Sequence, residues 1–408
     1  MRRSTTPPEY SLSSRTSILN ATISDGRISR PTRLTRSCAS KVTQGARSGR
    51  YINVTSPKSR TPHDAVVAVT HRCNARCVMC NIWKGDAPDR LLPEHMRKLP
   101  IELRTINLSG GEPFLRDDLV DFVRQARSRC PKAVITISTN AFLPDRIAEK
   151  MPELRRIDPD IRLAVSLDGL AAAHDRIRGV SGAYDRARGL IDRLGADGYR
   201  GIRLSMTLSN ENLDQLTDVA RLADKLGLEL GVVAAHGAGT HLGVEPDDVA
   251  IERAPAWLAG AFGRIIAPRL RSWRLKNWLR GHFAWQTYHY LTGRLWEIRC
   301  GAARDMFFLQ ADGEVYSCSV RGKEMGNIID QEFSEIWTGP QVDKVMEFVR
   351  RCPERCWMIC TARSTYRARW LSVLAWIVWN KLLAHLRLFR VRNLAPDDRG
   401  DEGRGGAA

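Results

Sequence analysis

Six short runs of β-branched and apolar residues recur along the chain, and their spacing limits its fold more than any other feature. Their first residues lie 26 to 40 residues apart, about the length of a strand with its following helix. The stretches between them carry helical apolar periodicity, for example Leu119 to Arg127 and Ala183 to Leu194. We therefore predict an α/β fold, a partial (β/α)6 TIM-like barrel, with its site at the carboxyl edge of the strands. The runs are 65–69, 105–108, 133–137, 163–167, 202–206 and 228–233.

Three cysteines, Cys73, Cys77 and Cys80, directly follow the first of these runs. In a chain of 408 residues without an apolar run of signal-peptide type, clustered cysteines indicate metal ligands and not a disulfide framework. Three thiolates can hold three irons of a cubane cluster and leave the fourth iron open to a substrate or cofactor. A structural zinc site is the alternative; it usually needs four ligands, and His71 is the available fourth.

The C-x3-C-x2-C trio resembles the signature of the radical S-adenosylmethionine (SAM) superfamily, in which an aromatic residue lies near the last cysteine. Here Trp83 comes three positions after that cysteine, and Met79 holds the usual aromatic position. The second run leads into Ser109-Gly110-Gly111-Glu112-Pro113, which is similar to the GGEP motif of the family, and the third ends in Ser138-Thr139-Asn140. The resemblance implies a SAM-coordinating [4Fe-4S] cluster on the trio, with the GGEP loop at the methionine amino group of SAM. The implied SAM-binding residues in these segments are Gly110, Gly111, Glu112, Ser138 and Asn140.

The fourth run leads into two further motif segments, Ser166-Leu167-Asp168-Gly169 and His174-Asp175-Arg176-Ile177-Arg178-Gly179. They resemble the S-x-D-G…H-D-x-x-R-G pattern of the subgroup that modifies peptides and small metabolites. The resemblance implies that Ser166 and Arg178 contact the SAM carboxylate, and a planar guanidinium suits a carboxylate. The alternative for Arg178 is an exposed cation at the end of a helix.

Five more cysteines, Cys300, Cys318, Cys352, Cys356 and Cys360, form a second group around a hairpin expected at Asp312-Gly313. The spacing G-x4-C, with Gly326-Asn327-Ile328 and Ile336-Trp337 downstream, resembles the SPASM/Twitch modules of the same superfamily. The resemblance implies one auxiliary [4Fe-4S] cluster, because the full module uses more cysteines for two. Its favoured ligands are Cys300, Cys318, Cys356 and Cys360, with Cys352 able to replace one of them, and a zinc knuckle is the alternative. Of the remaining cysteines, Cys130 is expected to be a buried thiol and Cys38 has no partner at ligand spacing.

Composition divides the rest of the chain. The net charge is +18, and residues 1–60 hold 12 Lys or Arg against two acidic residues, so 1–62 is predicted to be a basic, disordered extension. We expect the barrel core over 63–250, an aromatic-rich helical connector over 251–299, the cysteine module over 300–362 and a disordered tail over 391–408. An amphipathic helix is expected over 366–390, where a short Trp-bearing apolar stretch leads into cations. It is too short to span a bilayer, so it either packs on the protein or lies in a membrane interface.

The resemblance implies an oxidoreductase-like enzyme that reductively cleaves SAM to a 5′-deoxyadenosyl radical and abstracts hydrogen from an unactivated carbon. We favour a small-metabolite or lipid-linked substrate, because residues 1–60 are too polar for a leader-binding segment. A maturase of a ribosomally made peptide is the first alternative, and a nucleic-acid-modifying or nucleic-acid-binding iron–sulfur protein is the second. Nucleic acid is not expected as a partner, since residues 64–361 show no basic stripe.

The expected partners are the substrate, an electron donor such as flavodoxin or ferredoxin, and the cytoplasmic face of a membrane through a peripheral contact. The expected location is the cytoplasm. No catalytic acid or base can be named from the sequence; Asp305, His236 and His241 are positional candidates only.

Overall fold

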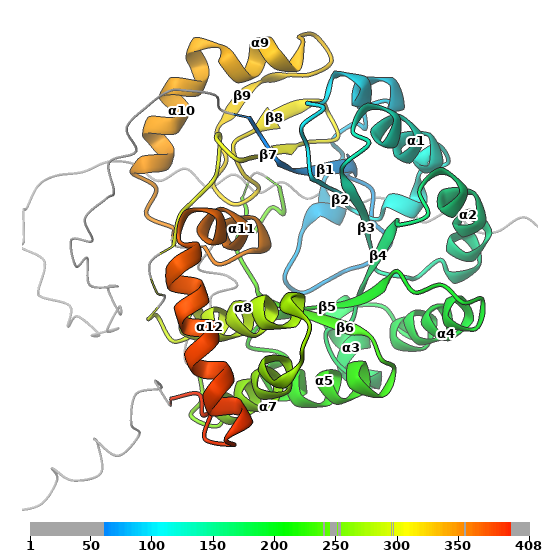
Figure 1. Ribbon diagram of the computed structural model, residues 1–408. Coiled ribbons are helices and arrows are strands. Elements are labelled where there is room, and N and C mark those ends of the chain that lie inside the picture. The colour runs from blue at the N-terminus through cyan, green and yellow to red at the C-terminus, as the bar shows by residue number, and fades with distance from the viewer. Residues whose placement is uncertain are drawn as a thin grey trace, which may run out of the picture. The chain divides into compact units, whose positions relative to one another are not determined.

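The computed structural model describes residues 61–239, 241–244, 251, 254–294, 296, 298–354 and 356–392. Most of the expected basic extension, including Cys38, and most of the expected tail lie outside these ranges. Within them, nine strands form one sheet in the order β6-β5-β4-β3-β2-β1-β7-β8-β9 (Figure 1). The strands are β1 Asp64–Thr70, β2 Thr105–Gly110, β3 Val134–Thr139, β4 Arg162–Ser166, β5 Ile202–Leu208, β6 Glu229–Ala234, β7 Met306–Leu309, β8 Glu314–Tyr316 and β9 Glu324–Asn327.

The six apolar runs seen in the sequence form β1 to β6, and every neighbouring pair among them is parallel. Side chains alternate along these strands, as the two-residue period requires. In β5, Ile202, Leu204 and Met206 are buried in the main hydrophobic core, whereas Arg203 and Ser205 between them point to the other face. In β5 the apolar residues therefore face the main core, and the polar ones lie on the opposite side of the sheet.

Helices connect the strands, and Figure 1 shows α1, α2 and α4 along the outside of the sheet. The described residues of the connector expected over 251–299 include helices α7 and α8, of which α8 packs against β6. The α-helices are α1 Leu119–Arg129, α2 Pro144–Ile157, α3 Ala171–Arg178, α4 Ala183–Ala196, α5 Leu216–Lys225, α7 Leu258–Arg271, α8 Leu275–Leu291, α9 Phe333–Thr338, α10 Pro340–Arg350, α11 Ile359–Ala368 and α12 Trp370–His385. Short 3-10 helices are η1 Ile82–Lys84, η2 Pro93–Lys98, η3 Pro113–Leu115 and η4 Leu213–Gln215.

The cysteine module shares its sheet with the barrel strands. Strand β7 pairs in parallel with β1, and β8 returns antiparallel to β7 through the hairpin expected at Asp312-Gly313. Phe307 of β7 is fully buried and packs against Phe333 and Trp337 of α9, at ring-centroid distances of 4.6 and 5.9 Å. Hydrogen bonding thus runs across the expected boundary between core and module, and the domain limits drawn from the sequence stay predictions.

The single amphipathic helix expected over 366–390 is replaced by α11, α12 and a short non-helical segment. Arg369 lies between the two helices and joins them: its N–H donates to the Thr365 carbonyl over 2.8 Å, and its carbonyl accepts from the Val373 N–H over 3.1 Å. Two cations of the expected amphipathic helix, Arg387 and Arg390, come after the end of α12 and so do not lie on a helix. None of the helices in the described ranges has the length and apolar character needed to cross a bilayer.

The buried aromatic cluster around Phe307 yields a test of how the module is held. Phe307→Ala should lower the free energy of unfolding by about 3–5 kcal/mol, because it removes a fully buried ring from a packed core. Denaturant titration measures this loss, with Ile101→Ala as the control because Ile101 is half exposed. A loss below about 1 kcal/mol for Phe307→Ala would show that the module does not depend on this packing.

Candidate active site

The loop with the three cysteines leaves the carboxyl end of β1 and is held by the end of α3. The Arg76 N–H donates to the carbonyl of Arg178, and the Val78 N–H donates to that of Ile177, each over 2.9 Å. Gly179 ends α3 in the left-handed region, with φ of 65°, and a Cβ there would lie 2.4 Å from the Arg76 carbonyl oxygen. The H-D-x-x-R-G segment therefore needs its glycine so that the cysteine loop can lie directly against it.

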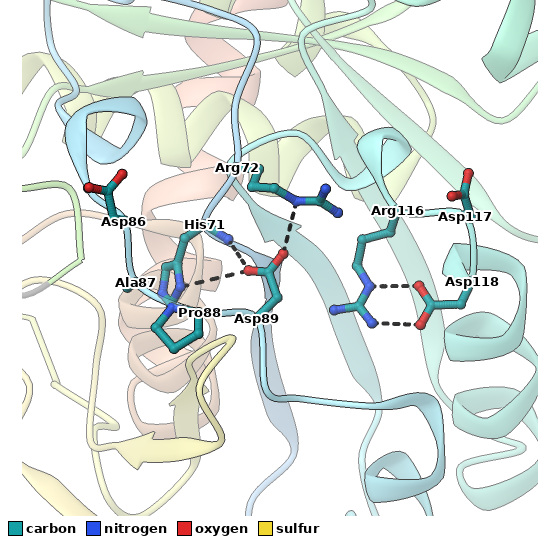
Figure 2. A pocket seen from close by; sticks show the side chains of 10 residues that line it. His71, Arg72, Asp86, Ala87, Pro88, Asp89, Arg116, Asp117 and Asp118 are labelled. Atoms are coloured by element: carbon teal, nitrogen blue, oxygen red, sulfur yellow. Dashed lines mark hydrogen bonds and ion pairs between the residues drawn. The ribbon is translucent and has the colours of Figure 1, made fainter.

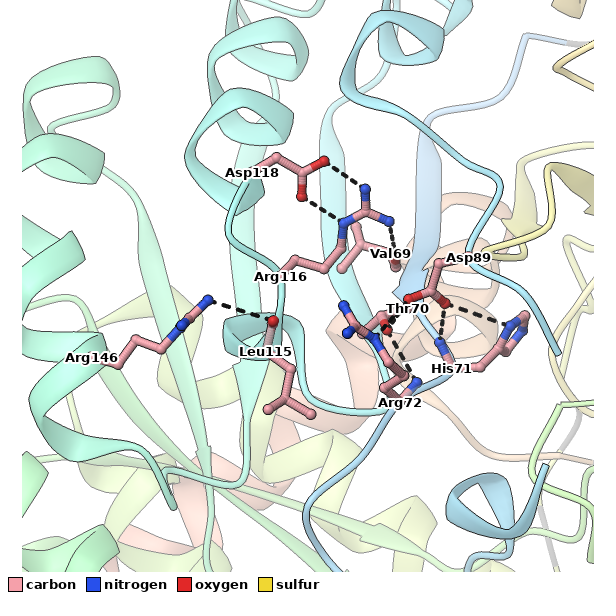
Figure 3. Close-up of polar contacts among 9 residues, drawn as sticks. All are labelled: Val69, Thr70, His71, Arg72, Asp89, Leu115, Arg116, Asp118 and Arg146. Atoms are coloured by element: carbon pink, nitrogen blue, oxygen red, sulfur yellow. Dashed lines mark hydrogen bonds and ion pairs between the residues drawn. The ribbon is translucent and has the colours of Figure 1, made fainter. Parts of the chain in front are cut away.

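Asp89 fastens the start of the same loop (Figure 3). Its carboxylate accepts from the Thr70 hydroxyl over 2.5 Å, the His71 N–H over 2.8 Å and Arg72 Nε over 3.3 Å. These residues directly precede Cys73, so one carboxylate fixes the direction in which the chain enters the loop. Asp89 was not predicted as a site residue, because it lies 16 residues beyond Cys73 in a segment without a motif.

The GGEP segment packs on the cysteine loop through its backbone. The Glu112 N–H donates to the Arg72 carbonyl over 2.9 Å, and a Cβ at Gly111 would lie 2.0 Å from that carbonyl oxygen. The Glu112 carboxylate is fully buried and accepts from the Phe114 N–H, the Thr139 hydroxyl and the Asn140 N–H over 3.1, 2.8 and 2.7 Å. Burial raises the pKa of Glu112 to about 7 in spite of these donors. Within the chain, Glu112 joins the loops after β2 and β3, and its predicted contact with SAM stays a prediction.

Asn140 connects the third strand to the cysteine loop. Its amide Nδ2 donates to Asn74 Oδ1 over 2.7 Å and lies 3.9 Å from the Cys73 sulfur. Ser138 faces the concave side of the sheet, where its hydroxyl donates to Asn107 Oδ1 over 3.0 Å. The structure therefore brings Asn140 to the cysteines, whereas Ser138 lies one step back along β3.

Arg178 is a buried partner of both Asp168 and Cys77. Its side chain is 12% exposed, with Nη2 2.6 Å from Asp168 Oδ2 and Nη1 3.6 Å from the Cys77 sulfur. Burial opposes the charge on the guanidinium, but Asp168 and Cys77 outweigh it and raise the pKa of Arg178 above its ordinary value. Arg178 is therefore not an exposed helix-end cation. Arg178 lies next to the trio, and its predicted contact with SAM stays a prediction.

Asp168, His174 and Asp175 of the fourth motif have structural partners that the sequence did not assign, whereas the predicted contact of Ser166 with SAM stays a prediction. The Asp168 N–H donates to Nδ1 of the buried His174 over 3.1 Å. Asp175 accepts from the backbone N–H groups of Gly182 and Tyr184, over 2.7 and 2.8 Å, and so satisfies free donors at the start of α4. Ser166 is half-buried at the end of β4, with Ser205 of β5 as its register partner.

The three thiols of the first group suit a metal cluster. Burial raises the pKa of Cys73 and Cys80 to about 11, and the charge of Cys77 raises both further. The Ala75 N–H points at the Cys73 sulfur over 3.4 Å. Adjacent, partly buried thiols of this kind lose their protons when they bind metal, and N–H donors to sulfur tune such clusters. In the described part of the chain, no three Cys, His, Asp or Glu side chains converge closely enough for a single metal ion.

The five thiols of the second group also act on one another. Burial raises the pKa of Cys300 to about 12 and that of Cys318 to about 11, and both respond to the charges of Cys352 and Cys360. Burial raises the pKa of Cys356 too, with Cys318, Cys300 and Cys352 adding to the effect. The backbone N–H groups of two residues, Val320 and Arg321, donate to the Cys318 thiol. The loops before β7 and after β8, the segment ahead of α11 and the first turn of α11 thus supply enough thiols for one four-iron cluster, with one left over.

A hollow of about 630 Å³ lies beside the start of the cysteine loop. Figure 2 shows Asp89 at its centre, flanked by Arg72 and Arg116. Arg116 is nearly buried; it holds Asp118 through two bonds of 2.7 and 2.6 Å and donates to the Val69 carbonyl over 2.9 Å. These bonds lower the pKa of Asp118. The lining therefore combines fixed charges of both signs.

The positional candidates for acid–base chemistry have partners within the chain. The backbone carbonyl of Asp305 accepts from the Asp64 N–H over 3.1 Å, which places Asp305 at the amino end of β1, opposite the trio. His236 Nδ1–H donates to the Ala234 carbonyl over 2.7 Å, and the His236 ring stacks on Tyr290 at 4.9 Å. Burial lowers the pKa of His236 and brings that of His241 to about 4.

His71 and Cys130 also have defined partners within the chain. His71 Nε2 lies 3.2 Å from Gln310 Oε1, at the end of β7, and its backbone is held by Asp89. Cys130 is fully buried, as the sequence indicated, and its thiol donates to the Pro100 carbonyl over 3.2 Å.

Comparison with known proteins agrees with this geometry. Residues 67–223 match the family model of the radical SAM superfamily, and residues 300–361 match SPASM, an iron–sulfur cluster-binding domain. Relatives include pre-heme d1 synthase of Dinoroseobacter shibae, 28% identical over 72% of this chain and 77% of that protein. Mycofactocin maturase MftC of Mycobacterium tuberculosis is 25% identical over 66% of this chain and 68% of its own.

Among solved structures, SuiB of Streptococcus suis bound to S-adenosylmethionine superposes with a TM-score of 0.52 at 14% identity. The alignment covers 71% of this chain and 68% of SuiB. This likeness concerns the fold. It confirms the predicted partial barrel followed by a cysteine-rich module.

Iron content tests the assignment of the two cysteine groups. Anaerobically reconstituted protein should hold about eight irons, and the Cys73→Ala/Cys77→Ala/Cys80→Ala variant should keep about four, because each group is predicted to hold one cubane. The Cys130→Ala variant is the control and should keep all of them. Loss of all iron in the triple variant, or retention of zinc in its place, would contradict the assignment.

The Arg178–Asp168 pair yields a second test. Arg178→Gln should cost about 3–5 kcal/mol of unfolding free energy, because it leaves a buried carboxylate without its partner. The Asp168→Asn/Arg178→Gln double variant should lose less than the sum of the two single variants. Denaturant titration measures the losses, with the exposed Arg176→Gln as control. Additive losses would mean that the two side chains do not stabilise each other.

Proposed function

This chain belongs to the radical SAM superfamily and carries a SPASM iron–sulfur domain, and from that premise we propose that it is the maturase of a ribosomally made peptide. As a radical SAM enzyme it uses SAM, a SAM-coordinating [4Fe-4S] cluster and an auxiliary iron–sulfur site. When bound, these cofactors supply a 5′-deoxyadenosyl radical able to take a hydrogen atom from an unactivated carbon.

In this proposal the role of each side chain follows from its position. Cys73, Cys77 and Cys80 hold the SAM-coordinating cluster, and three thiolates leave one iron for SAM. Arg178 and Asn140, which lie next to Cys77 and Cys73, hold the polar end of SAM. The second cysteine group holds the auxiliary cluster, which either accepts an electron from the substrate or fixes its position.

The choice of a peptide as substrate rests on one observation: a maturase is among the relatives of this chain. It replaces our preference from sequence for a small-metabolite or lipid-linked substrate. The S-x-D-G…H-D-x-x-R-G segment supports the choice, because it resembles a subgroup that includes peptide-modifying enzymes. The hollow beside the cysteine loop supports it too, since fixed carboxylates and guanidinium groups suit a polar chain better than an acyl chain.

A small metabolite is the second candidate, favoured by the likeness to pre-heme d1 synthase. An electron donor such as flavodoxin or ferredoxin belongs to either proposal, because SAM cleavage needs one electron from outside the chain. Neither the donor nor a lipid-linked substrate is supported by a residue in the site.

Deuterium transfer separates the two substrate classes. The encoding organism is grown on deuterated medium, its extract is divided, and one half is digested with a protease that is then removed. The reconstituted enzyme, SAM and dithionite are added to both halves, and 5′-deoxyadenosine is analysed by mass spectrometry. A peptide substrate predicts deuterium in 5′-deoxyadenosine from the intact half and little from the digested half.

The Cys73→Ala enzyme is the control and should form no 5′-deoxyadenosine in either half. Equal deuterium transfer from both halves would contradict a peptide substrate and favour the small metabolite. Absence of 5′-deoxyadenosine in every wild-type reaction would contradict the assignment of the trio itself.

A further inference from the structure

Helix α12 is apolar around its whole circumference but is covered on one side only. Val373, Ile377 and Ala384 are buried where α12 packs against α7 and α8 (Figure 1). A helix that is apolar all round is normally buried all round. Here the opposite side is exposed, and we call it the α12 face. It consists of Trp370, Leu371, Leu374, Val378, Trp379, Leu382 and Leu386, with Leu388 just beyond.

The α12 face continues onto the segment between α7 and α8. Lys381 of α12 donates to the carbonyls of Leu270 and Ser272, each over 2.9 Å, and its ammonium lies 4.6 Å from the ring centroids of Trp273 and Trp278. Trp273 is 82% exposed. An apolar groove of about 410 Å³ runs between this segment and α12. Three exposed tryptophans, Trp273, Trp370 and Trp379, thus belong to the α12 face and the segment beside it.

The two sequence ranges that form this surface carry positive charges only. Residues 258–294 and 357–392 carry seven Lys or Arg each and no Asp or Glu. Lys381 and Arg367 have partners within the protein. Lys381 donates to the backbone carbonyls of Leu270 and Ser272, and Arg367 pairs with Asp64. Other arginines near the α12 face are exposed and make no ion pair with a described carboxylate. They are Arg271, Arg274, Arg387, Arg390 and Arg392.

We propose that the α12 face and the neighbouring segment 271–275 dock on an anionic lipid bilayer. Exposed Trp and Leu side chains at one level, flanked by free arginines, meet both needs of an interfacial helix: apolar burial and attraction to anionic headgroups. A second copy of the chain on the same face would bring two sets of arginines together without a carboxylate to pair them. A nucleic acid would pair with the arginines but would leave the leucines in water.

Vesicle co-sedimentation of the full-length protein tests the proposal, and it needs two variants with matched controls. Leu371→Ser/Val378→Ser/Trp379→Ser removes part of the α12 face, and its control is Leu92→Ser/Ile101→Ser/Trp257→Ser, whose side chains are also exposed. Arg387→Gln/Arg390→Gln/Arg392→Gln removes three charges, and its control is Arg156→Gln/Arg186→Gln/Arg200→Gln on other exposed surfaces. The probes are vesicles of phosphatidylcholine alone and of phosphatidylcholine with phosphatidylglycerol.

The wild type should bind the anionic vesicles, and less so as salt rises. The apolar and the arginine variants should each lower the partition coefficient about tenfold, while both controls bind like the wild type. Iron content and melting temperature should not change in any of them, because all the substituted side chains are exposed. The controls keep residues 1–60, so they also account for binding by that basic segment.

Three results would overturn the proposal. The wild type could remain in the supernatant, or the apolar variant could bind as its control does, which would leave only a general attraction to polyanions. The third is a wild-type dimer in the absence of vesicles that becomes a monomer in the apolar variant, which would make the α12 face a contact between copies of the chain.

Discussion

Strand β1 is the element on which the rest of this structure depends. It pairs in parallel with β2 on one edge and with β7 on the other, so the barrel strands and the module hairpin are one hydrogen-bonded sheet. Its carboxyl end leads directly into Cys73. At its amino end the buried Asp64 holds Arg363 and Arg367 over 2.9 and 2.7 Å. Both arginines belong to α11, which also carries Cys360, so both cysteine groups are fixed to the same strand.

The cysteine loop is held by charge as well as by the sheet. Asp89 fixes its start, and the Asp168–Arg178 pair lies against Cys77. Burying an ion pair costs desolvation free energy, and removing one partner destabilises the fold further. The main effect of the Asp168–Arg178 pair is therefore to position the cysteine loop, and its net contribution to stability is small. A guanidinium next to a thiol ligand also offsets the negative charge that a thiolate cluster brings into the site.

The features of the fold that depend on local sequence pattern could be predicted from the sequence. Six apolar runs became six parallel strands, and the trio lies at the carboxyl end of the first. The partners of Glu112 and Arg178 were not predictable, because Thr139 lies 27 residues from Glu112 and Asp168 shows no partner until the chain folds. Gly111 shows the same limit: the structure brings the Arg72 carbonyl against it, a contact that its motif does not show, and its predicted contact with SAM stays a prediction. The β1–β7 pairing joins residues about 240 apart, and no local periodicity carries that information.

The central claim is that Cys73, Cys77 and Cys80 hold a four-iron cluster with one iron open to SAM. Electron paramagnetic resonance of the dithionite-reduced, reconstituted protein, recorded with and without SAM, tests it most directly. Coordination of SAM to the open iron should change the signal of this cluster and leave an auxiliary-cluster signal unchanged, and the change should be absent in the Cys77→Ala variant. A spectrum that SAM does not alter, or an alteration that survives Cys77→Ala, would contradict the account.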